Sequence, residues 1–423
     1  MTLQIGFSST GAGIQYDLAA YDSDIVFGQN VFVASTGSHA LRGTSSYHSV
    51  HVAGMLYGAD DGIHLGDADT DTGSTVFVAA TGNVSALDDA ISIQGDRARI
   101  ENHGTVSGNY GVYLFGTSGD ASITNYGVIS GEYQGIRHSY GTNTTLTVVN
   151  YGTISAGDRS TGDAFFSGLN TLTDKIVNRG LMVGGIDFGA GDDSYDGRGG
   201  TVTGTIFGGA GVDTFRPGMG IETIIGDSGN DLLDFRVGGA IQVALDAAIA
   251  NTGTAEGDEY SDIENIYGSA FGNDLLRGNA LNNGFYGFGG NDTLQGGAGV
   301  DQLVGGAGTD TLSGGAGNDT FVFLALTEAG DVIADFGNVG GNDDRFVIKA
   351  AAFGPGLVAG ALDPDLFFSG PSNTAGGTED RFVFNTTTTT LWFDSNGSGA
   401  GGLTMIADLQ AGVALTAADI VLI

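Results

Sequence analysis

Short runs of alternating apolar and polar residues fill the first 183 positions of the chain, which is typical of strands with one buried face. Four stretches place an Asn, one variable residue and a Gly before such a run: ENHGTVSG (101–108), TNYGVISG (124–131), VNYGTISA (149–156) and VNRGLMVG (177–184). Their glycines are 23, 25 and 28 residues apart. A repeat of short strands at this period, without helical periodicity, predicts a parallel β-helix of about seven coils over residues 1–183.

The frame of this repeat places side chains in columns, one residue per coil. Four asparagines share a column in which each amide would hydrogen-bond to the next: Asn102, Asn125, Asn150 and Asn178. Two further columns are expected on the surface. The column after each second strand carries His64, Ser92, Tyr113, Arg137 and Phe165. The column in the Asn-x-Gly turns carries His103, Tyr126, Tyr151 and Arg179. Aromatic and basic groups one coil apart can bind a sugar chain, but we favour the alternative in which they decorate the surface of the solenoid without a partner. His138 falls at a core position, where we expect a buried, hydrogen-bonded histidine.

A second repeat, nine residues long, occupies residues 269–323. Its clearest copies, from Gly287 onward, read GFGGNDTLQ, GGAGVDQLV, GGAGTDTLS and GGAGNDTFV, and their carboxylates are Asp292, Asp301, Asp310 and Asp319. This G-G-x-G-x-D-x-U-x pattern predicts a calcium-binding parallel β-roll, in which two repeats make one coil. Asp292 should then lie over Asp310, and Asp301 over Asp319, at the ~4.8 Å spacing of strands. Carboxylates this close repel by roughly 1–4 kcal/mol, and a calcium ion held by oxygen ligands removes that repulsion.

Weaker copies of the nonapeptide lie upstream. Residues 269–286 place Asp274 and Asn283 at the carboxylate position, and a separate block at 208–234 places Asp213, Glu222 and Asp231 there. Asp193 occupies the same position in FGAGDDSYD, two residues out of register with that block.

Composition narrows the possible partners. Glycine supplies 77 of 423 residues, and the formal net charge is −35. Because such a chain is repelled by phosphates, we expect neither nucleic acid binding nor binding to anionic membranes. No segment approaches ~20 uninterrupted apolar residues, so we expect no membrane insertion. There is no cysteine, and the N-terminal residues have neither the basic segment nor the apolar core of a cleaved secretory signal.

Residues 184–423 resemble the RTX family of calcium-binding repeat proteins. The resemblance rests on the nonapeptides, on the lead-in SDIENIYGSAFGNDLLRGNALNN (261–283), and on the C-terminal segments DVIADF (331–336) and LTAADIVLI (415–423). It implies export by type I secretion through an uncleaved C-terminal signal, and an extracellular or cell-surface location. The expected fold is therefore all-β, divided into a β-helix (1–183), a first RTX block (184–234), a connector (235–268), a second RTX β-roll block (269–323), and a C-terminal cap with the secretion signal (324–423).

The resemblance also implies a ligand set for several Ca²⁺ ions. One site would use backbone carbonyls and carboxylates from Gly287, Gly289, Asp292, Gly306, Gly308 and Asp310. A second would use Gly296, Ala298, Asp301, Gly315, Gly317 and Asp319. Asn283 and Glu222 depart from the Asp of the motif, which puts the sites that they line in doubt.

Two classes of function fit these features. The first is a non-enzymatic structural protein of the cell surface or extracellular matrix, of surface-layer, matrix or adhesin type, whose partner is itself in the presence of calcium. The second is a polysaccharide lyase or epimerase built on the β-helix. The chain has no H-E-x-x-H and no G-x-S-x-G motif, and its charge repels uronate polymers. We therefore expect no enzymatic activity. A cell-surface polysaccharide is a further candidate partner.

Overall fold

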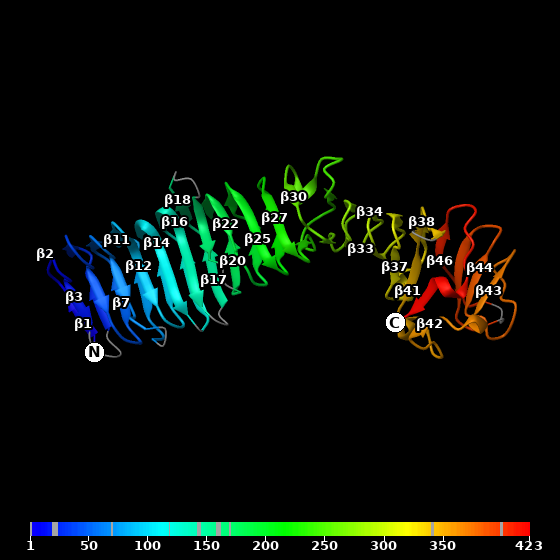
Figure 1. The fold of residues 1–423 in the computed structure, drawn as a ribbon, viewed down its shortest axis with the longest axis horizontal. Helices are drawn as coiled ribbons and strands as arrows, with labels where there is room; N and C mark the ends of the chain where they lie inside the picture. Colours follow the sequence, from blue (N-terminus) through cyan, green and yellow to red (C-terminus); the bar gives the residue numbers. More distant parts are fainter. Residues whose placement is uncertain are drawn as a thin grey trace. The chain divides into compact units, whose positions relative to one another are not determined.

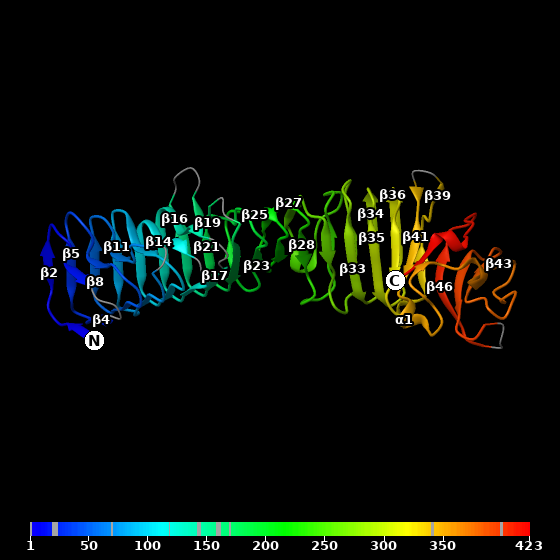
Figure 2. The ribbon, with the colours of Figure 1, turned by 60° about the horizontal axis from the view of Figure 1, so that its bottom comes forward.

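The computed structural model describes residues 2–18, 24–68, 71–117, 119–141, 145–157, 162–168, 171–339, 342–397 and 401–423. The chain forms two compact units, the first made of Met1–Asp231 with Asp258–Ile263, and the second of Leu232–Gly257 with Glu264–Ile423. Both units consist mainly of parallel strands stacked coil upon coil (Figures 1 and 2), and the C-terminal part of the second unit adds antiparallel pairs. The predicted all-β class is therefore confirmed.

The first unit is a three-faced parallel β-helix. One face stacks β1 (Thr2–Ile5), β4 (Asp24–Phe27), β7 (Ser49–Val52), β10 (Thr75–Val78), β13 (Arg99–Asn102), β15 (Ala121–Asn125), β17 (Thr145–Asn150), β20 (Thr173–Asn178), β23 (Ser194–Asp196) and β26 (Thr214–Arg216). The second stacks β2 (Ser9–Gly11), β5 (Phe32–Ser35), β8 (Met55–Gly58), β11 (Asn83–Ala86), β14 (Thr105–Thr117), β16 (Val128–Gly141), β18 (Thr153–Ala156), β21 (Leu181–Val183) and β24 (Thr201–Val202). The third stacks β3 (Tyr16–Leu18), β6 (Leu41–Gly43), β9 (Ile63–Leu65), β12 (Asp89–Gln94), the second halves of β14 and β16, β19 (Asp163–Ser167), β22 (Gly185–Asp187), β25 (Thr205–Gly211), β27 (Thr223–Gly229) and β30 (Glu259–Ser261).

The period-two pattern buries one side chain per coil at each core position. On the first face this column runs Ile25, Val50, Val76, Ile100, Ile123, Val148, Ile176, Tyr195 and Phe215, and each of these side chains is at most 2% exposed. Stacking of like apolar residues in register explains why the sequence repeats at all, since each coil buries its apolar face only against its neighbours.

The structure places no break at residue 183. Strand β20 pairs directly with β23, so the first RTX block continues the β-helix and the first unit extends to Asp231. Only the coil length changes, from 28 residues between Thr147 and Lys175 to 19 between Lys175 and Ser194. The two repeats can share one stack because the strand spacing is the same in both, and only the turns become shorter.

The second unit is a two-faced β-roll with a C-terminal cap. One face stacks β28 (Leu232–Asp234), β31 (Asn265–Tyr267), β33 (Gly284–Gly289), β35 (Gln302–Ala307), β37 (Thr320–Phe323), β41 (Arg345–Ile348) and β47 (Ile420–Leu422). The other stacks β29 (Gln242–Ala244), β32 (Leu275–Arg277), β34 (Thr293–Ala298), β36 (Thr311–Ala316), β38 (Asp331–Ile333) and β46 (Leu403–Leu409), and it continues with β45 (Thr390–Asp394), β44 (Phe382–Asn385) and β43 (Phe367–Gly370). Short elements complete the unit: α1 (Ala350–Phe353), β39 (Asn338–Val339), β40 (Asn342–Asp343), β42 (Gly360–Ala361) and the 3₁₀ turns η1 (Gly253–Ala255), η2 (Leu326–Glu328), η3 (Pro364–Leu366) and η4 (Ala417–Asp419).

Residues 235–268, for which the sequence predicts a connector, are divided between the two units. Strand β30 adds to β27 of the first unit, whereas β29 and β31 belong to the second. At the C-terminus, β47 pairs with β41 and buries Ile420 and Leu422, so the predicted export signal is also a strand of the core.

Candidate metal centre

The glycines of the nonapeptide have two different physical roles, which one repeat illustrates. Gly306 and Gly308, at the second and fourth positions, have φ of 99° and 150°, a region that side chains disfavour. Gly305, at the first position, has ordinary backbone angles, but a Cβ there would collide with Oδ2 of Asp310. The first glycine therefore makes room for the carboxylate of its own repeat. Phe288, which replaces the second glycine, adopts φ of 71° and keeps the same turn.

The carboxylates of the second unit form two columns, one at each edge of the roll. In each column the backbone N–H of one residue donates to the side-chain Oδ1 of the next over 2.7–2.9 Å. The columns run Asp274, Asp292, Asp310 and Asp331, and Asn283, Asp301, Asp319 and Asp344. Asp292 thus lies over Asp310 and Asp301 over Asp319, as the spacing of 18 residues predicts.

The second carboxylate oxygen in these columns is buried. Among the residues that the structure describes, Oδ2 of Asp292, Asp301, Asp310 and Asp319 has no hydrogen-bond partner. Burial raises the pKa of Asp292 and of Asp301 to about 7, and it raises the pKa of Asp310 and Asp319 as well. A buried ionised oxygen without a partner is costly, and an oxygen-seeking cation is the group that would satisfy it.

The first unit contains a column of the same kind. The backbone N–H groups of Asp174, Asp193 and Asp213 donate in turn to Oδ1 of Asp193, Asp213 and Asp231, over 2.5–2.8 Å. Within the described residues, Oδ2 of Asp193 and of Asp213 is again buried without a hydrogen-bond partner. Burial raises the pKa of Asp193 to about 9 and that of Asp213 to about 6. The offset of two residues at Asp193 is absorbed by a coil of 20 residues rather than 18.

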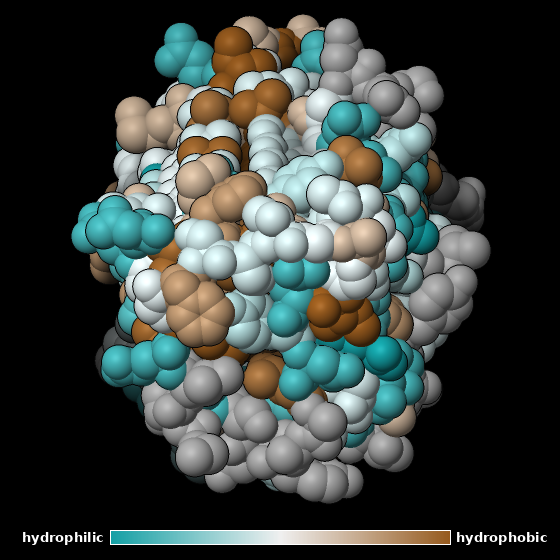
Figure 3. Space-filling view, turned by 90° about the vertical axis from the view of Figure 1, so that its left-hand side faces the viewer, coloured by the Kyte–Doolittle hydropathy of each residue, from teal (hydrophilic) through white to brown (hydrophobic). Residues whose placement is uncertain are grey.

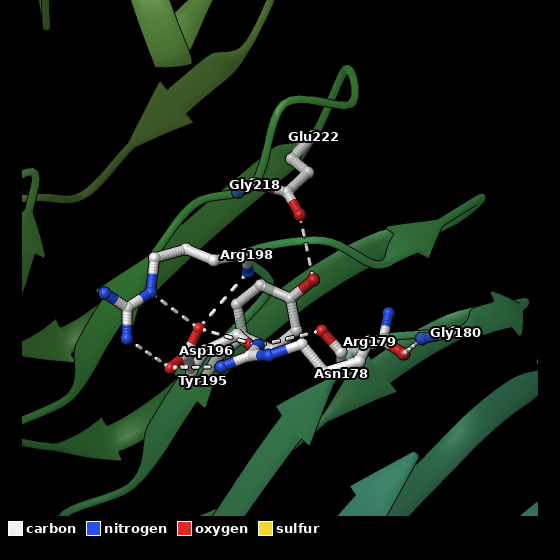
Figure 4. Close-up of polar contacts among 8 residues, drawn as sticks. All are labelled: Asn178, Arg179, Gly180, Tyr195, Asp196, Arg198, Gly218 and Glu222. Carbon is white, nitrogen blue, oxygen red and sulfur yellow. Dashed lines mark hydrogen bonds and ion pairs between the residues drawn. The ribbon is translucent and has the colours of Figure 1, made fainter. Parts of the chain in front are cut away.

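Three other predicted ligands, Glu222, Asp274 and Asn283, have side-chain oxygens that already accept hydrogen bonds from groups of the protein. Glu222 accepts the Tyr195 hydroxyl at Oε1 (2.8 Å) and the Gly218 N–H at Oε2 (2.8 Å) (Figure 4). Asp274 accepts the Ile241 N–H at Oδ1 and the Ser269 N–H at Oδ2. Asn283 accepts the Asn279 N–H, and its amide donates to the Glu264 carbonyl. Their positions match the motif, but their side chains are already part of a protein hydrogen-bond network.

Sequence reasoning missed the residues that continue the columns at their ends. Asp331 follows Asp310 after 21 residues and Asp344 follows Asp319 after 25, so neither fits the nine-residue period. Burial raises the pKa of Asp331 to about 8 and that of Asp344 to about 6. Asp174, above Asp193, lies in a coil of the Asn type and was missed for the same reason. Each of them stands directly before or within a strand, but that signal is too common to single them out.

The predicted asparagine ladder is present. The side-chain Nδ2 of Asn102, Asn125 and Asn150 each donates to Oδ1 of the next rung over 2.8–2.9 Å, and all four side chains are fully buried. The last rung, Asn178, donates to the Thr201 carbonyl. Beyond it, Figure 4 shows Asp196 clamped between the guanidinium groups of Arg179 and Arg198. Burial alone would raise the pKa of Asp196, but the hydrogen bonds from these arginines hold it well below the usual range.

The outward aromatic column is a stack of rings rather than a row of open faces. His103 and Tyr126 stack at 4.6 Å between ring centroids and 15° between planes, and Tyr126 and Tyr151 at 5.0 Å and 6°. Phe77 and His51 extend the same stack. Because each face covers its neighbour, these rings present mainly their edges to solvent, which favours the structural interpretation over sugar stacking.

Two further sequence predictions have clear outcomes. In the other outward column, Phe166 and not Phe165 pairs with Arg137; Phe165 points into the core and is fully buried. Phe165 lies opposite the buried Ile136, so the outward position of this coil comes one residue later than the sequence frame predicts. His138 is fully buried with Nδ1 3.1 Å from Oδ1 of Asp174, as expected of a satisfied core histidine.

A parallel β-solenoid with buried carboxylate columns at its glycine turns defines the class of calcium-binding β-roll proteins. The family model of the RTX calcium-binding nonapeptide repeat matches four copies in this chain, within residues 217–234 and 286–321. The chain therefore carries RTX repeats, which indicate a calcium-binding, secreted protein. No curated protein matches the chain. In the part of the chain that the structure describes, we find no helix of sufficient length and apolarity to cross a membrane.

Proposed function

We propose that this protein is a non-enzymatic structural component of the cell surface or extracellular matrix, which calcium folds and then assembles. The observation that carries the proposal is the set of buried carboxylate oxygens without hydrogen-bond partners at Asp193, Asp213, Asp292, Asp301, Asp310 and Asp319. Such columns have no evident use in a chain that folds without cations. They are explained if folding awaits a compartment in which calcium is abundant.

The residues fit a calcium ion. Oδ2 of each of these aspartates supplies a hard oxygen ligand, and the glycine turns can direct backbone carbonyls toward the same point. We assign the ligands as Gly287, Gly289 and Asp292 with Gly306, Gly308 and Asp310, and as Gly296, Ala298 and Asp301 with Gly315, Gly317 and Asp319. Asp193, Asp213 and Asp231 would serve the first unit. Glu222, Asp274 and Asn283 would instead close the columns through the hydrogen bonds described above.

The first coil of the β-helix is the surface that we assign to self-association. Strands β1, β2 and β3 pair with β4, β5 and β6 on one side, and the described residues provide no partner strand on the other. Figure 3 looks onto this end and shows apolar patches among the polar surface. Phe7 of the first coil is 68% exposed. Open strand edges beside apolar groups associate readily, while net charge of one sign opposes close approach until cations bind.

Static light scattering of the full chain tests the proposal. Apparent mass should rise with protein concentration in several millimolar calcium but not in the same concentration of magnesium. Phe7→Lys should weaken the rise, whereas Phe271→Lys, which makes the same change at a 91% exposed site in the second unit, should not. A monomer at all calcium concentrations, or equal effects of the two variants, would contradict assembly through the first coil.

The alternative function, a polysaccharide lyase or epimerase, makes a different prediction. It requires a base or acid on the β-helix surface, and His103 and Tyr126 are the candidates that the sequence offers. In the structure His103 Nε2 lies 2.7 Å from a carboxylate oxygen of Glu101, and both rings are stacked. Turnover of a uronate polymer that is lost in His103→Ala would favour the enzyme.

A further inference from the structure

A cluster of two histidines and an aspartate lies on the first unit, away from the carboxylate columns. His39 precedes β6 by two residues, and Asp61 precedes β9 by two residues, so the parallel pairing of β6 with β9 stacks them in consecutive coils. His64 lies within β9, three residues after Asp61. The ligand atoms of all three side chains lie within 4.8 Å of one another.

The two imidazoles converge on a single carboxylate oxygen. Oδ2 of Asp61 is 2.8 Å from Nδ1 of His64 and 3.5 Å from Nδ1 of His39. The rings are stacked at 4.9 Å between centroids with 22° between planes. Ligand atoms around a tetrahedral zinc ion are about 3.4 Å apart, given bonds of about 2.0–2.1 Å. To reach that geometry the His39 ring would turn, and the ion would replace the hydrogen bond that the Asp61 backbone N–H donates to Nδ1 of His39 over 3.2 Å.

The surroundings hold these groups in place. The other oxygen of Asp61, Oδ1, accepts the backbone N–H of Asp89 in the next coil at 3.3 Å, which leaves Oδ2 for the histidines. Nε2 of His39 lies 3.6 Å from Oδ2 of Asp60, an arrangement like the carboxylate–histidine pairs that orient metal ligands. The side chains are 18%, 8% and 20% exposed for His39, Asp61 and His64, so an ion can reach them. Burial lowers the pKa of His39, which favours the neutral imidazole that binds metals.

We propose that His39, Asp61 and His64 form a binding site for a divalent transition-metal ion, distinct from the calcium sites and absent from the RTX repeats. Imidazole nitrogens suit zinc, nickel and copper, whereas calcium takes six to eight oxygen ligands. The site can therefore select its ion in the presence of calcium. Because His39 belongs to one coil and Asp61 and His64 to the next, a bound ion would staple the two coils together.

Isothermal titration of the full chain with zinc chloride, in saturating calcium, tests the site. We expect one tight site per chain, weakened by about tenfold or more in His39→Ala and in His64→Ala. His103→Ala is the matched control, because it removes a histidine that is paired with one carboxylate and no second imidazole. Undiminished zinc binding in both site variants, or no binding by the wild type, would overturn the proposal.

A second measurement separates lost ligands from lost structure. In the wild type, zinc should slow hydrogen exchange at the amides of Ala40 and Gly62, which donate across the coils to Asp61 and Asp89. It should leave the exchange at Asp292 and Asp301 in the second unit unchanged. Zinc binding that leaves the exchange at Ala40 and Gly62 unaltered would place the ion elsewhere and reject the staple.

Discussion

Without calcium, the fold of the second unit should lose stability as the pH rises, and calcium should abolish this dependence. Burial raises the pKa of Asp292 and Asp301 from 3.8 to about 7 in the folded, ion-free chain. The folded state then binds the proton more tightly than the unfolded state does. The stability that this proton provides is fully present below pH ~4 and is lost as the pH rises through about 7.

The magnitude follows from the size of the shift. A change of about 3 pKa units corresponds to about 4 kcal/mol for each carboxylate, of which about 3 kcal/mol falls between pH 5 and pH 8. Two such groups approach the whole stability of an ordinary domain. A bound ion reverses the balance because it requires the ionised form, and it adds about 2.7 kcal/mol for each site at a hundredfold excess over Kd.

Asparagine substitution isolates this effect, because an amide resembles the protonated carboxyl without its charge. The chain itself places Asn283 in the same column as Asp301. At pH 8 in chelator, Asp292→Asn and Asp301→Asn should each raise the free energy of unfolding by up to about 4 kcal/mol. In millimolar calcium, both should lower it. Asp408→Asn, an exposed carboxylate of β46, should do neither.

The single tryptophan makes the measurement specific. Trp392 lies in β45 of the second unit, so its fluorescence in urea reports on that unit alone. Unfolding midpoints should fall from pH 5 to pH 8 in chelator, and they should hold or rise over the same range in calcium. Equal midpoints at pH 5 and pH 8 in chelator, or asparagine variants that destabilise the ion-free chain, would refute the reasoning.

Three further outcomes are expected. Asn125→Ala breaks the ladder at a fully buried rung, and we expect it to cost the first unit about 2–4 kcal/mol by circular dichroism in urea. The control Asn30→Ala, at an exposed turn of the same unit, should cost less than about 1 kcal/mol. Gly305→Ala should weaken calcium binding measured by calorimetry, because the added methyl group would collide with the Asp310 carboxylate. The control Ala307→Ser, at an exposed position of the same turn, should leave calcium binding unchanged. Deletion of residues 415–423 should keep the chain inside cells that carry a type I exporter, as measured by its amount in the medium. The control Ile348→Ala weakens the core beside β47 but keeps these residues, so this variant should still be secreted.

The repeats predicted most of the architecture because a solenoid makes spacing in the sequence into distance in space. Nine- and eighteen-residue intervals placed Asp292 over Asp310, and the Asn-x-Gly frame placed Asn125 between Asn102 and Asn150. Both inferences needed only the period and the strand geometry. The all-β class followed for the same reason.

Features that depend on turn length were not predictable in this way. Asp331 and Asp344 join the carboxylate columns after intervals of 21 and 25 residues, and β30 joins the first unit after 36 residues. The satisfied side chains of Glu222 and Asp274 depend on Tyr195 and Ser269, whose hydroxyl groups carry no signal in the sequence. The cluster of His39, Asp61 and His64 arises from coils of unequal length, which no fixed period aligns.

The two ladders give the chain two chemically different ways to stack the same strands. An asparagine rung is both donor and acceptor, so the column from Asn102 to Asn178 satisfies itself without any ion. An aspartate rung accepts one backbone N–H at Oδ1, and its second carboxylate oxygen, Oδ2, has no hydrogen-bond partner among the described residues. Within the first unit the change from one ladder to the other coincides with the change to short, glycine-rich coils. Coils of the first kind need no ion to fold, whereas coils of the second kind bury carboxylates whose charge must be neutralised, by protons at low pH or by a bound cation above about pH 7. We therefore expect any dependence on calcium to be a local property of the aspartate rungs, since both kinds of rung support the same parallel stack of strands.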